Sequence, residues 1–484
     1  METEKKPGLL ISFIPVGLLI VLMTLNVVFW GEDSSYGPNQ LALLLGGLLS
    51  GMLGFVYCKI PYKVLEQRTI DSVKVSLQPI FILLIVGMLI GIWILAGIVP
   101  AMIYYGVQII SPSFFLPTAL IICAVVSLAT GSSWSTVGTV GIALIGVGQT
   151  LGIDEGMVAG AIVSGSYFGD KMSPLSDTTN LAPAMAGSDL FEHIKHMIYT
   201  SGPAFLLAFI LFCLIGFGNE GNFSSDNEIS KVVELIDAHF NISLWLFTLP
   251  VLIFTMVGKK VPALPALMVG CLVGAVYAVL FQGETLSKLS EGKTLYEVII
   301  QTAYNGYELN TGNVVIDKLL SRGGMSNMLN TVWLIMMAMV FGGMMEATGM
   351  LGAIANGLLK LIRGTVSLVS ATIGTAIFLN LTTSDQYISI VVSGRIFRDA
   401  YRDYGLKAKN LSRAVEDGGT VTSVLVPWNT CGAYFSSVMG VATLTYLPFA
   451  FFNLLSPIVS ISLAAMNKTM EPLEASLEDG SGHA

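Results

Sequence analysis

Apolar stretches of about 20 residues recur along this chain, and they constrain its fold more than any other feature. A helix of that length spans the hydrocarbon core of a bilayer. Of the 484 residues, 54% are hydrophobic and only 12% are charged, whereas a soluble chain carries roughly 25% charge. So little charge cannot cover a water-soluble protein of this size. The sequence therefore predicts an all-α, polytopic membrane protein rather than an unusually apolar soluble one.

The apolar stretches differ in length, which indicates two kinds of membrane segment. Near-complete spans are expected at 8–30, 40–58, 78–99, 113–130, 197–218, 242–258, 262–281, 327–348 and 441–464. Shorter or broken pieces are expected at 135–150, 156–168, 366–380, 384–398 and 412–426. Short apolar pieces interrupted by Gly or Pro are typical of the discontinuous helices and re-entrant hairpins of transporters.

Lysine and arginine residues give the expected orientation, because both are enriched in cytoplasmic loops. If Lys5 and Lys6 lie inside, counting the spans places the other dense basic clusters on the same side: 59–74, 259–260, 360–363 and 395–413. The acidic stretch within 219–241 then lies outside. We therefore expect a multi-pass protein of the bacterial cytoplasmic membrane with both termini in the cytoplasm.

The two halves of the chain are expected to form an inverted repeat, because their spans run in opposite directions. Gly91 and Gly97 are six residues apart, as are Gly343 and Gly349. Two polar motifs also recur about 252 residues later, 130–133 at 382–385 and 174–177 at 427–430. This divides the chain into a first repeat (1–218), an external connecting loop (219–241), a second repeat (242–466) and a cytoplasmic tail (467–484).

The strongest candidate site interrupts an apolar span at residues 169–180. Pro174 breaks the helix and frees backbone carbonyl oxygens. Asp170 and Asp177 lie on nearly one face of a continuous helix, or converge if the helix breaks. A carboxylate at bilayer depth costs about 2.5–3.5 kcal/mol unless it is paired, bound to an ion or facing water. Three neighbouring side chains add neutral oxygen atoms: Thr178, Thr179 and Asn180. This run predicts a Na⁺ site, with an exposed loop as the alternative.

A hydroxyl-rich turn at 130–136 joins two apolar pieces, as the tip of a hairpin would. We expect Ser132 and Ser133 to offer oxygen atoms to the same cation. The alternative is that these hydroxyls bond to the backbone of their own helix. The matching positions of the second half bear Thr383, Asp385, Asn429 and Thr430. These residues are expected to face the first site, although Asp385 can equally serve as a helix N-cap.

Three further charged residues are candidates for relaying protons or modulating the site. Lys171 brings an ammonium group that can compete with Na⁺, or that can form a salt bridge with the neighbouring aspartate. Glu346 lies in an otherwise apolar helix and is either a relay residue or a structural one. Asp417 either belongs to the repeat-related site or, with Glu416, pairs with Arg413 at the cytoplasmic end.

Motifs of enzymes do not occur in the sequence: neither a nucleophile elbow, a zinc-protease motif nor a nucleotide-binding loop is present. We therefore expect no enzymatic activity, no cofactor and no metal beyond a transported Na⁺, so that any transport is secondary. His193 and His196 are three residues apart, which is a weak metal-binding pattern. No basic patch is interleaved with aromatic residues, so nucleic acid is not an expected partner.

Two runs, GSSWSTVGTVG at 131–141 and SGSYFGDKMSPLSDTTNLAP at 164–183, resemble the NhaC-type Na⁺/H⁺ antiporter family, as does PAMIYYG at 100–106. The resemblance implies membership of a wider ion-transporter superfamily with inverted repeats, two hairpins and broken-helix tips around a midplane site. It also implies, for many members, a homodimer and elevator-type alternating access. Carried over, it implies a cation site made of Ser132, Ser133, Asp170, Asp177, Thr178, Thr179 and Asn180.

The residues and the resemblance together predict an exchange of Na⁺ for H⁺. An aspartate can hold a proton or a sodium ion but not both, so that competition at one site couples their movements. Similar families include sodium-coupled malate/lactate antiporters, which makes organic-acid exchange the alternative. The lack of arginine in the polar motifs of the hairpin tips and helix breaks, 130–136, 169–180, 382–385 and 427–430, disfavours it. A receptor or scaffold without transport is a third interpretation. The expected partners are membrane lipids, Na⁺, H⁺ and a second copy of the chain.

Overall fold

Apolar sequence becomes helix in a bilayer, because a helix satisfies its own backbone hydrogen bonds. The computed structural model describes residues 6–218, 226–290, 292–312, 317, 319–360 and 362–473. Within these ranges the regular structure is helical, apart from one isolated β-bridge between Leu406 and Pro472. Eight of the described helices are long and apolar enough to cross a membrane, or up to ten if each of two bent pairs is one span. The predicted all-α, polytopic membrane fold is confirmed.

The first half of the chain contains long apolar helices joined by shorter segments. Its elements are α1 (Leu9–Trp30), η1 (Gly31–Ser35), α2 (Pro38–Val56), α3 (Tyr62–Val75), α4 (Leu77–Leu95), α5 (Ile98–Ile109), α6 (Pro112–Thr130), α7 (Ser133–Thr136), the π-helical η2 (Val137–Gly141), α8 (Ile142–Thr150), α9 (Glu155–Met172), α10 (Asp177–Ala186) and α11 (Leu190–Gly218).

The second half is built in a similar way and ends with another set of interrupted helices. Its elements are α12 (Asp226–His239), η3 (Leu244–Phe247), α13 (Thr248–Gly258), α14 (Ala263–Phe281), α15 (Gly283–Leu289), α16 (Leu295–Asn305), η4 (Ser326–Met328), α18 (Leu329–Ala347), α19 (Met350–Leu359), α20 (Thr365–Thr382), α21 (Gln386–Asp403), α22 (Ala408–Val415), the π-helical η5 (Glu416–Thr420), α23 (Val421–Ser423), α24 (Thr430–Met439), α25 (Thr443–Tyr446), η6 (Leu447–Phe449) and α26 (Phe451–Ala465).

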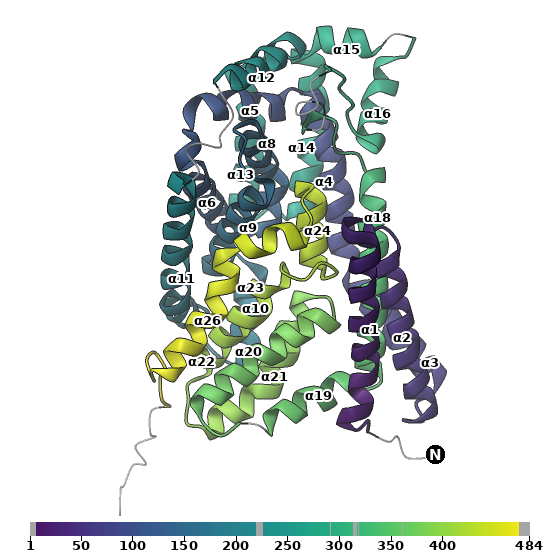
Figure 1. Ribbon diagram of the computed structural model, residues 1–484, viewed down its shortest axis with the longest axis vertical. Helices are drawn as coiled ribbons and strands as arrows, with labels where there is room; N and C mark the ends of the chain where they lie inside the picture. Colours follow the sequence, from purple (N-terminus) through teal and green to yellow (C-terminus); the bar gives the residue numbers. More distant parts are fainter. Residues whose placement is uncertain are drawn as a thin grey trace, which may run out of the picture.

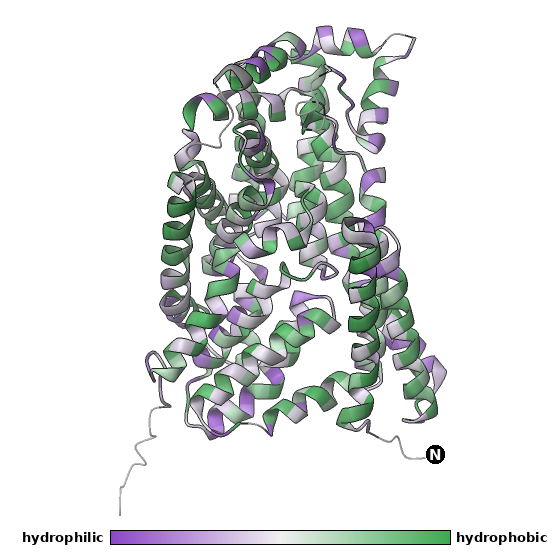
Figure 2. Cartoon of the chain, viewed as in Figure 1, coloured by the Kyte–Doolittle hydropathy of each residue, from purple (hydrophilic) through white to green (hydrophobic). Residues whose placement is uncertain are grey.

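The helices form an elongated body in which both ends of the described chain lie toward one end of the molecule. Helix α1 begins and α26 finishes at this end, and α12, α15 and α16 lie at the other (Figure 1). Helices α1, α2 and α18 pack side by side, while α6, α9, α11 and α26 form a second group. The outer helix α1 is strongly apolar along its length, and α11 is so beyond its polar first turns (Figure 2). Exposed residues such as Leu10, Phe29 and Leu214 suit contact with lipid.

The segments between the expected spans are more helical than the sequence predicts. The basic stretch after residue 59 forms α3, which continues into α4 as a span of 34 residues from Tyr62 to Leu95. The segment 100–112, between two expected spans, contains most of the short apolar helix α5, and the described part of the 219–241 loop contains α12. Lys, Glu, Gln and Arg are good helix formers, so charged connectors such as those of α3 and α12 become amphipathic helices when an apolar side can pack.

The predicted interruptions are present. Helix α9 ends at Met172 and α10 begins at Asp177, with Pro174 in the loop between them. In the second half, α23 ends at Ser423 and α24 begins at Thr430. These pairs are discontinuous helices, whose ends expose backbone groups inside the molecule.

Corresponding positions of the two halves adopt the same local conformation. Gly97 before α5 and Gly349 before α19 are both left-handed. The N-caps of α7 and α21 are Ser132 and Asp385, each of which accepts backbone hydrogen bonds at the start of its helix. These matches are the basis for the inverted repeat that we propose below.

Small residues bring the two helices behind the first interruption into close contact. Gly165 and Gly169 lie four residues apart on α9 and face α6. A Cβ atom on Gly165 would lie 2.2 Å from the Leu120 carbonyl oxygen, and one on Gly169 would lie 2.3 Å from that of Ala124. Such small residues at four-residue spacing let membrane helices approach through their backbones. The α6–α9 contact thereby fixes the position of the last turn of α9 relative to α6.

Candidate functional site

Asp170 lies in the last turn of α9, where the first discontinuous helix is interrupted. Its side chain is 7% exposed. Its Oδ2 atom accepts hydrogen bonds from the Ser133 backbone nitrogen at 3.0 Å and from the Ser133 Oγ atom at 2.6 Å. Hydrogen bonds to an ionised acceptor are among the strong ones. The structure therefore brings together Ser133 and Asp170, two residues that the sequence assigned to one cation site.

The turn between α6 and α7 packs closely against the loop of the interrupted helix. Gly131 occupies the left-handed region at φ +70°, and a Cβ atom there would approach the Leu175 backbone carbon to 2.6 Å. Ser132 then caps α7 by accepting a hydrogen bond from the Ser135 backbone nitrogen at 3.1 Å. Glycine at the turn thus allows a contact with the α9–α10 loop that no other residue permits.

The residues that follow Asp170 shape the loop at the interruption. The Thr179 hydroxyl donates to the carbonyl oxygens of Lys171 at 3.0 Å and Asp170 at 3.3 Å. Asn180 donates to the Ser176 carbonyl at 2.6 Å. The Thr178 hydroxyl shares a hydrogen bond of 3.1 Å with that of Ser176. The side chains of these three residues therefore organise the freed backbone, with Thr178 and Thr179 buried and Asn180 exposed.

Asp177, the second acid of the motif, is exposed in the first turn of α10. Its position at a helix N-terminus favours a negative charge, because the amide groups and the helix dipole point toward it. The exposed acid thus lies at the water-accessible edge of the interruption, while Asp170 lies inside.

The tip between α20 and α21 places the second-half residues together. Asp385 is 1% exposed, and its Oδ1 atom accepts hydrogen bonds from the backbone nitrogens of Tyr387 at 2.9 Å and Ile388 at 3.1 Å. The Thr430 hydroxyl lies 3.5 Å from the other carboxyl oxygen, Oδ2. Asp385 is therefore a helix N-cap, the alternative role expected for it, with one oxygen directed at α24.

Thr383 and Asn429 complete this group. The Thr383 hydroxyl donates to the Leu379 carbonyl at 2.8 Å. The Asn429 Oδ1 atom accepts a hydrogen bond from the Cys431 backbone nitrogen at 3.0 Å, and its Nδ2 atom donates to the Asn380 carbonyl at 3.1 Å. Both side chains therefore cap helix ends beside Asp385.

Aromatic and hydroxyl side chains connect the two groups. The ring of Tyr434 stacks on Trp134 with centroids 4.0 Å apart, and its hydroxyl donates to the Trp134 carbonyl at 3.0 Å. The Tyr167 and Ser423 hydroxyls are 3.3 Å apart. Within the described residues, the buried Ser135 Oγ and Ser384 Oγ atoms have no protein hydrogen-bond partner, so these oxygens are available to a bound species.

Lys171 forms its ion pair with Asp417 of η5, 246 residues away, and not with the adjacent aspartate. Both side chains are fully buried. Asp417 Oδ1 also accepts hydrogen bonds from Ser456 at 2.7 Å and Thr200 at 3.2 Å. The expectation that Lys171 neutralises Asp170 is therefore wrong, because the lysine turns toward the second half of the chain.

The acidic residues outside this pair differ from expectation in their burial. Glu346 is exposed in the last turn of α18, away from the buried carboxyls. In one of the two interpretations Glu416 and Asp417 pair with Arg413, but Asp417 pairs with Lys171 and the fully buried Glu416 forms no ion pair with Arg413 in the described part of the chain. Arg413 donates to the Thr469 hydroxyl at 2.9 Å. The sequence signal for Glu416 was an acidic pair between apolar residues and two glycines, but nothing local distinguished the acid with a partner from the acid without one.

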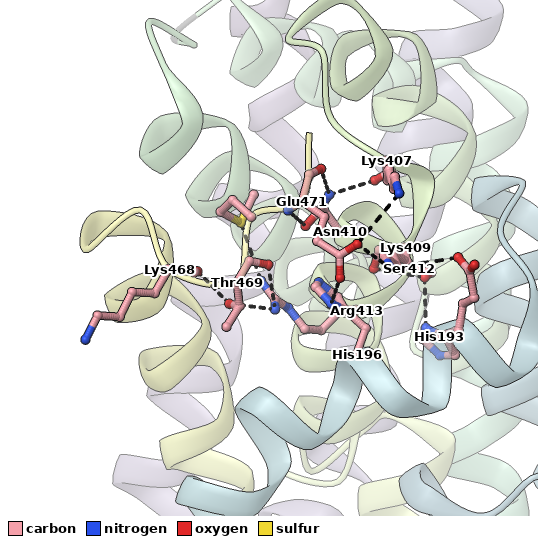
Figure 3. Close-up of polar contacts among 12 residues, drawn as sticks. His193, His196, Lys407, Lys409, Asn410, Ser412, Arg413, Lys468, Thr469 and Glu471 are labelled. Atoms are coloured by element: carbon pink, nitrogen blue, oxygen red, sulfur yellow. Dashed lines mark hydrogen bonds and ion pairs between the residues drawn. The ribbon is translucent and has the colours of Figure 1, made fainter. Parts of the chain in front are cut away.

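Polar residues near the end of α26 form a separate network (Figure 3). His193 Nδ1 lies 2.8 Å from the Ser412 hydroxyl. Glu471 forms an ion pair with Lys409 at 2.5 Å and lies 3.7 Å from His196 Nδ1. No group of three or more His, Cys, Asp or Glu residues in the described part of the chain is arranged to hold a metal ion.

The chain is similar to known transporters over nearly its whole length. A family model described as the Na⁺/H⁺ antiporter family matches residues 165–468. The Na⁺/H⁺ antiporter NhaC of Alkalihalophilus pseudofirmus is 37% identical over 95% of this chain and 96% of its own. The malate-2H⁺/Na⁺-lactate antiporter of Bacillus subtilis is 36% identical over 96% of this chain and 95% of its own.

One further relative and one solved structure are similar to the chain. The arginine/ornithine antiporter ArcD of Halobacterium salinarum is 34% identical over 95% of this chain and 92% of its own. The solved structure of MtrF from Neisseria gonorrhoeae aligns over 93% of this chain and 96% of its own, with 13% identity and a TM-score of 0.38. The family model and the full-length relatives confirm the resemblance to the NhaC type, and the chain belongs to the Na⁺/H⁺ antiporter family.

Proposed function

We propose that this protein exchanges Na⁺ for H⁺ across the membrane through competition at Asp170 and Asp177. The observation that supports this most is the buried Asp170 carboxylate at the interrupted end of α9, held by both donors of Ser133. A charge at this depth is costly unless a counter-charge is present, so the carboxylate favours a bound cation or a proton. Exposed Asp177 attracts the cation to the edge of the site.

The second half contributes a related group to the same exchange. Asp385 Oδ2 and the Thr430 hydroxyl offer oxygen atoms from the α20–α21 tip and α24. We infer that the two halves are inverted repeats, because Ser132 and Asp385, and likewise Ser176 and Asn429, cap the corresponding helices. Such repeats place sites where broken helices meet.

The exchange uses an elevator-type movement, in which one part of the chain slides against another. The moving part consists of α6–α10 and α20–α24, and the scaffold of α1, α2, α4, α14 and α18. The protein lies in the bacterial cytoplasmic membrane with both termini inside, and it forms a homodimer through the scaffold. The extensive packing of α6 on α9, and separately of α2 on α18, supports two bodies of this kind.

Proton flux in proteoliposomes tests the exchange. Purified protein is reconstituted with an internal pH indicator, and Na⁺, Li⁺ or K⁺ is added outside. Asp170→Asn and Asp177→Asn are expected to abolish proton movement driven by Na⁺. Asp71→Asn is the matched control, since Asp71 is an exposed aspartate of α3 that pairs with Lys74. Wild-type flux in Asp170→Asn would refute competition at this carboxylate.

Coupled exchange of an organic acid is the second candidate, favoured by the malate-2H⁺/Na⁺-lactate antiporter, a relative of 36% identity. The pairing of Lys171 weighs against it, because Asp417 already matches the charge of this buried ammonium group. Uptake of labelled malate or lactate by the same proteoliposomes, with and without a Na⁺ gradient, decides between the two.

A further inference from the structure

Glu416 is a buried carboxyl group that the exchange at Asp170 does not use. It begins the π-helical segment η5, and its side chain is fully buried. Neither carboxyl oxygen makes a hydrogen bond of normal geometry among the residues that the structure describes, and the Thr420 hydroxyl is the polar group close to it. An isolated carboxylate cannot be kept ionised at low dielectric, and such a group takes up a proton instead. The geometry therefore fits a protonated Glu416 in this conformation.

Hydrogen-bond donors are present in this region, as the neighbouring residue Asp417 shows. Asp417 is equally buried but receives the Lys171 ammonium group and the hydroxyls of Thr200 and Ser456. The charged side chains that act on Glu416 are Lys171, Asp417 and Asp170. The ammonium group of Lys171 therefore pairs with Asp417 and not with Glu416, so that only one of the two adjacent acids has a counter-charge in contact with it.

Polar side chains share a helical face with Glu416 on the side toward the end of the molecule where the chain begins and finishes. Ser412 lies one turn before Glu416 and Thr420 one turn after it, on the same helical face. The Ser412 hydroxyl is 2.8 Å from His193 Nδ1. Figure 3 shows His193 beside Ser412, with His196 and Glu471 farther along the same network. Hydroxyl and imidazole groups can both pass protons, so Ser412 and His193 are the side chains through which a proton from Glu416 would move.

The π-helical geometry adds a means of movement. Segments with i→i+5 hydrogen bonds are rare, costly and frequent at functional sites. Gly418 and Gly419 of η5 pack closely, with a Cβ atom on Gly418 lying 2.9 Å from the Ile373 Cα atom. A return of η5 to α-helical geometry would rotate Glu416 relative to Ser412, which would change its access to these polar side chains.

We propose that Glu416 is a second proton-binding site, which takes up and releases one proton in each transport cycle by way of Ser412 and His193. The proton moves between the Glu416 carboxyl group and water, and no bond other than O–H forms or breaks. The proposal rests on the proposed Na⁺/H⁺ exchange but assigns Glu416 to the proton side alone. Asp170 and Asp177 remain the groups that meet the cation.

The number of protons moved per Na⁺ tests this assignment. Proteoliposomes are clamped at known Na⁺ gradients, and the pH gradient at which net flux stops gives the H⁺:Na⁺ ratio. Glu416→Gln keeps the shape of a protonated glutamate but cannot release a proton, so the ratio is expected to fall by one while Na⁺ still binds. Glu416→Asp should restore the wild-type ratio. Glu66→Gln, an exposed position on α3, is the matched control.

A spectroscopic measurement keeps the proposal testable even if a variant does not transport. Infrared difference spectra of the full-length protein between acidic and alkaline pH should contain the carbonyl stretch of a buried carboxylic acid, and Glu416→Gln should remove it. An unchanged H⁺:Na⁺ ratio, or an unchanged carboxylic-acid band, in Glu416→Gln overturns the assignment. Absence of Na⁺/H⁺ exchange in the wild-type protein would instead refute the proposed function, and the infrared band would still decide on Glu416.

Discussion

Thr179 shows how one hydroxyl group can hold an interrupted helix in shape. It is fully buried and donates to the carbonyl oxygens of Lys171 and Asp170 at the end of α9, the second of which also accepts a hydrogen bond from the Ser173 backbone nitrogen. A net intramolecular hydrogen bond contributes about 0.5–1.5 kcal/mol. Thr179→Ala is therefore expected to lower the stability by about that amount, measured as a reduced melting temperature in detergent. Thr179→Ser keeps the donor, and an equal loss in that variant would contradict the reason given.

Single residues also mark the limit of what the sequence predicts about the site. Asp170 and Ser133 stand out because polar residues that interrupt apolar stretches are expensive to bury. The partner of Lys171 could not be inferred in this way. Asp417 lies 246 residues away, and the pairing depends on how α9 and η5 pack. The same holds for Glu416, whose burial is a property of the tertiary structure and not of its neighbours in sequence.

The contact between α6 and α9 gives a prediction at the scale of elements. Gly169 lies directly before Asp170 and touches α6 through its backbone, 2.3 Å from the Ala124 carbonyl oxygen as measured from an added Cβ atom. Gly169→Ala must therefore push the helices apart, with an expected loss of stability of about 1–3 kcal/mol from overpacking and weaker Na⁺-driven flux. Gly374→Ala in α20 is the control, because a Cβ atom there has no neighbour within 4 Å. Equal effects of the two would contradict a role for close packing.

The segment 467–473 makes a second prediction at this scale, because it is held against α22 by polar contacts. Hydrogen bonds run from the Lys407 nitrogen to the Glu471 carbonyl at 3.0 Å and from the Leu473 nitrogen to the Gly405 carbonyl at 2.7 Å. The hydrogen bond from Lys409 lowers the pKa of Glu471, with Lys407 and His196 also nearby. A carboxylate with a lowered pKa stabilises the docked form above its ordinary pKa, about 4.3, and loses this effect as the pH falls through the lowered value.

Hydrogen exchange measures this docking. Protection of the Lys407 and Leu473 amides, compared with that of unfolded peptides at each pH, should decrease when the pH falls below the ordinary range of glutamate. Glu471→Gln removes the charge and should give weaker protection that no longer depends on pH in this range. A wild-type pH dependence in that variant would assign the effect to another group.

The sequence predicts a helix well where a long apolar stretch determines it, and less well where packing against another helix determines it. Long apolar stretches became α1, α2, α6 and α14 with boundaries close to those expected, since length and composition suffice there. The sequence predicts a basic loop where the structure has helix α3. The buried face of this helix consists of only a few residues, among them Leu65 and Thr69, and gives little apolar periodicity. Such helices are stabilised by their partners, here α18, and a single sequence does not reveal the partner.

At the scale of the whole molecule, the proposed elevator requires the α24 side of the chain to slide past α18. The two bodies touch where the Ser437 hydroxyl of α24 lies 3.1 Å from the sulfur atom of Met328, the last residue of η4 and the N-cap of α18. Within the scaffold, the Ser50 hydroxyl of α2 lies 3.4 Å from that of Thr348, the C-cap of α18. The first pair joins the proposed moving part to the scaffold, whereas both members of the second pair belong to the scaffold. Only a link between the first pair should therefore block sliding.

Cysteines at these positions turn that difference into a measurement. In a background where Cys58, Cys123, Cys213, Cys271 and Cys431 are replaced, mercuric ion bridges introduced pairs of nearby thiols. Bridging Ser437→Cys to Met328→Cys is expected to stop Na⁺-driven proton flux, and dithiothreitol should restore it, because movement of α24 along α18 is blocked. Bridging Ser50→Cys to Thr348→Cys should leave flux unchanged. Full activity with the first bridge in place would mean that the two bodies do not slide, and that access to Asp170 changes through local movements of the interrupted helices instead.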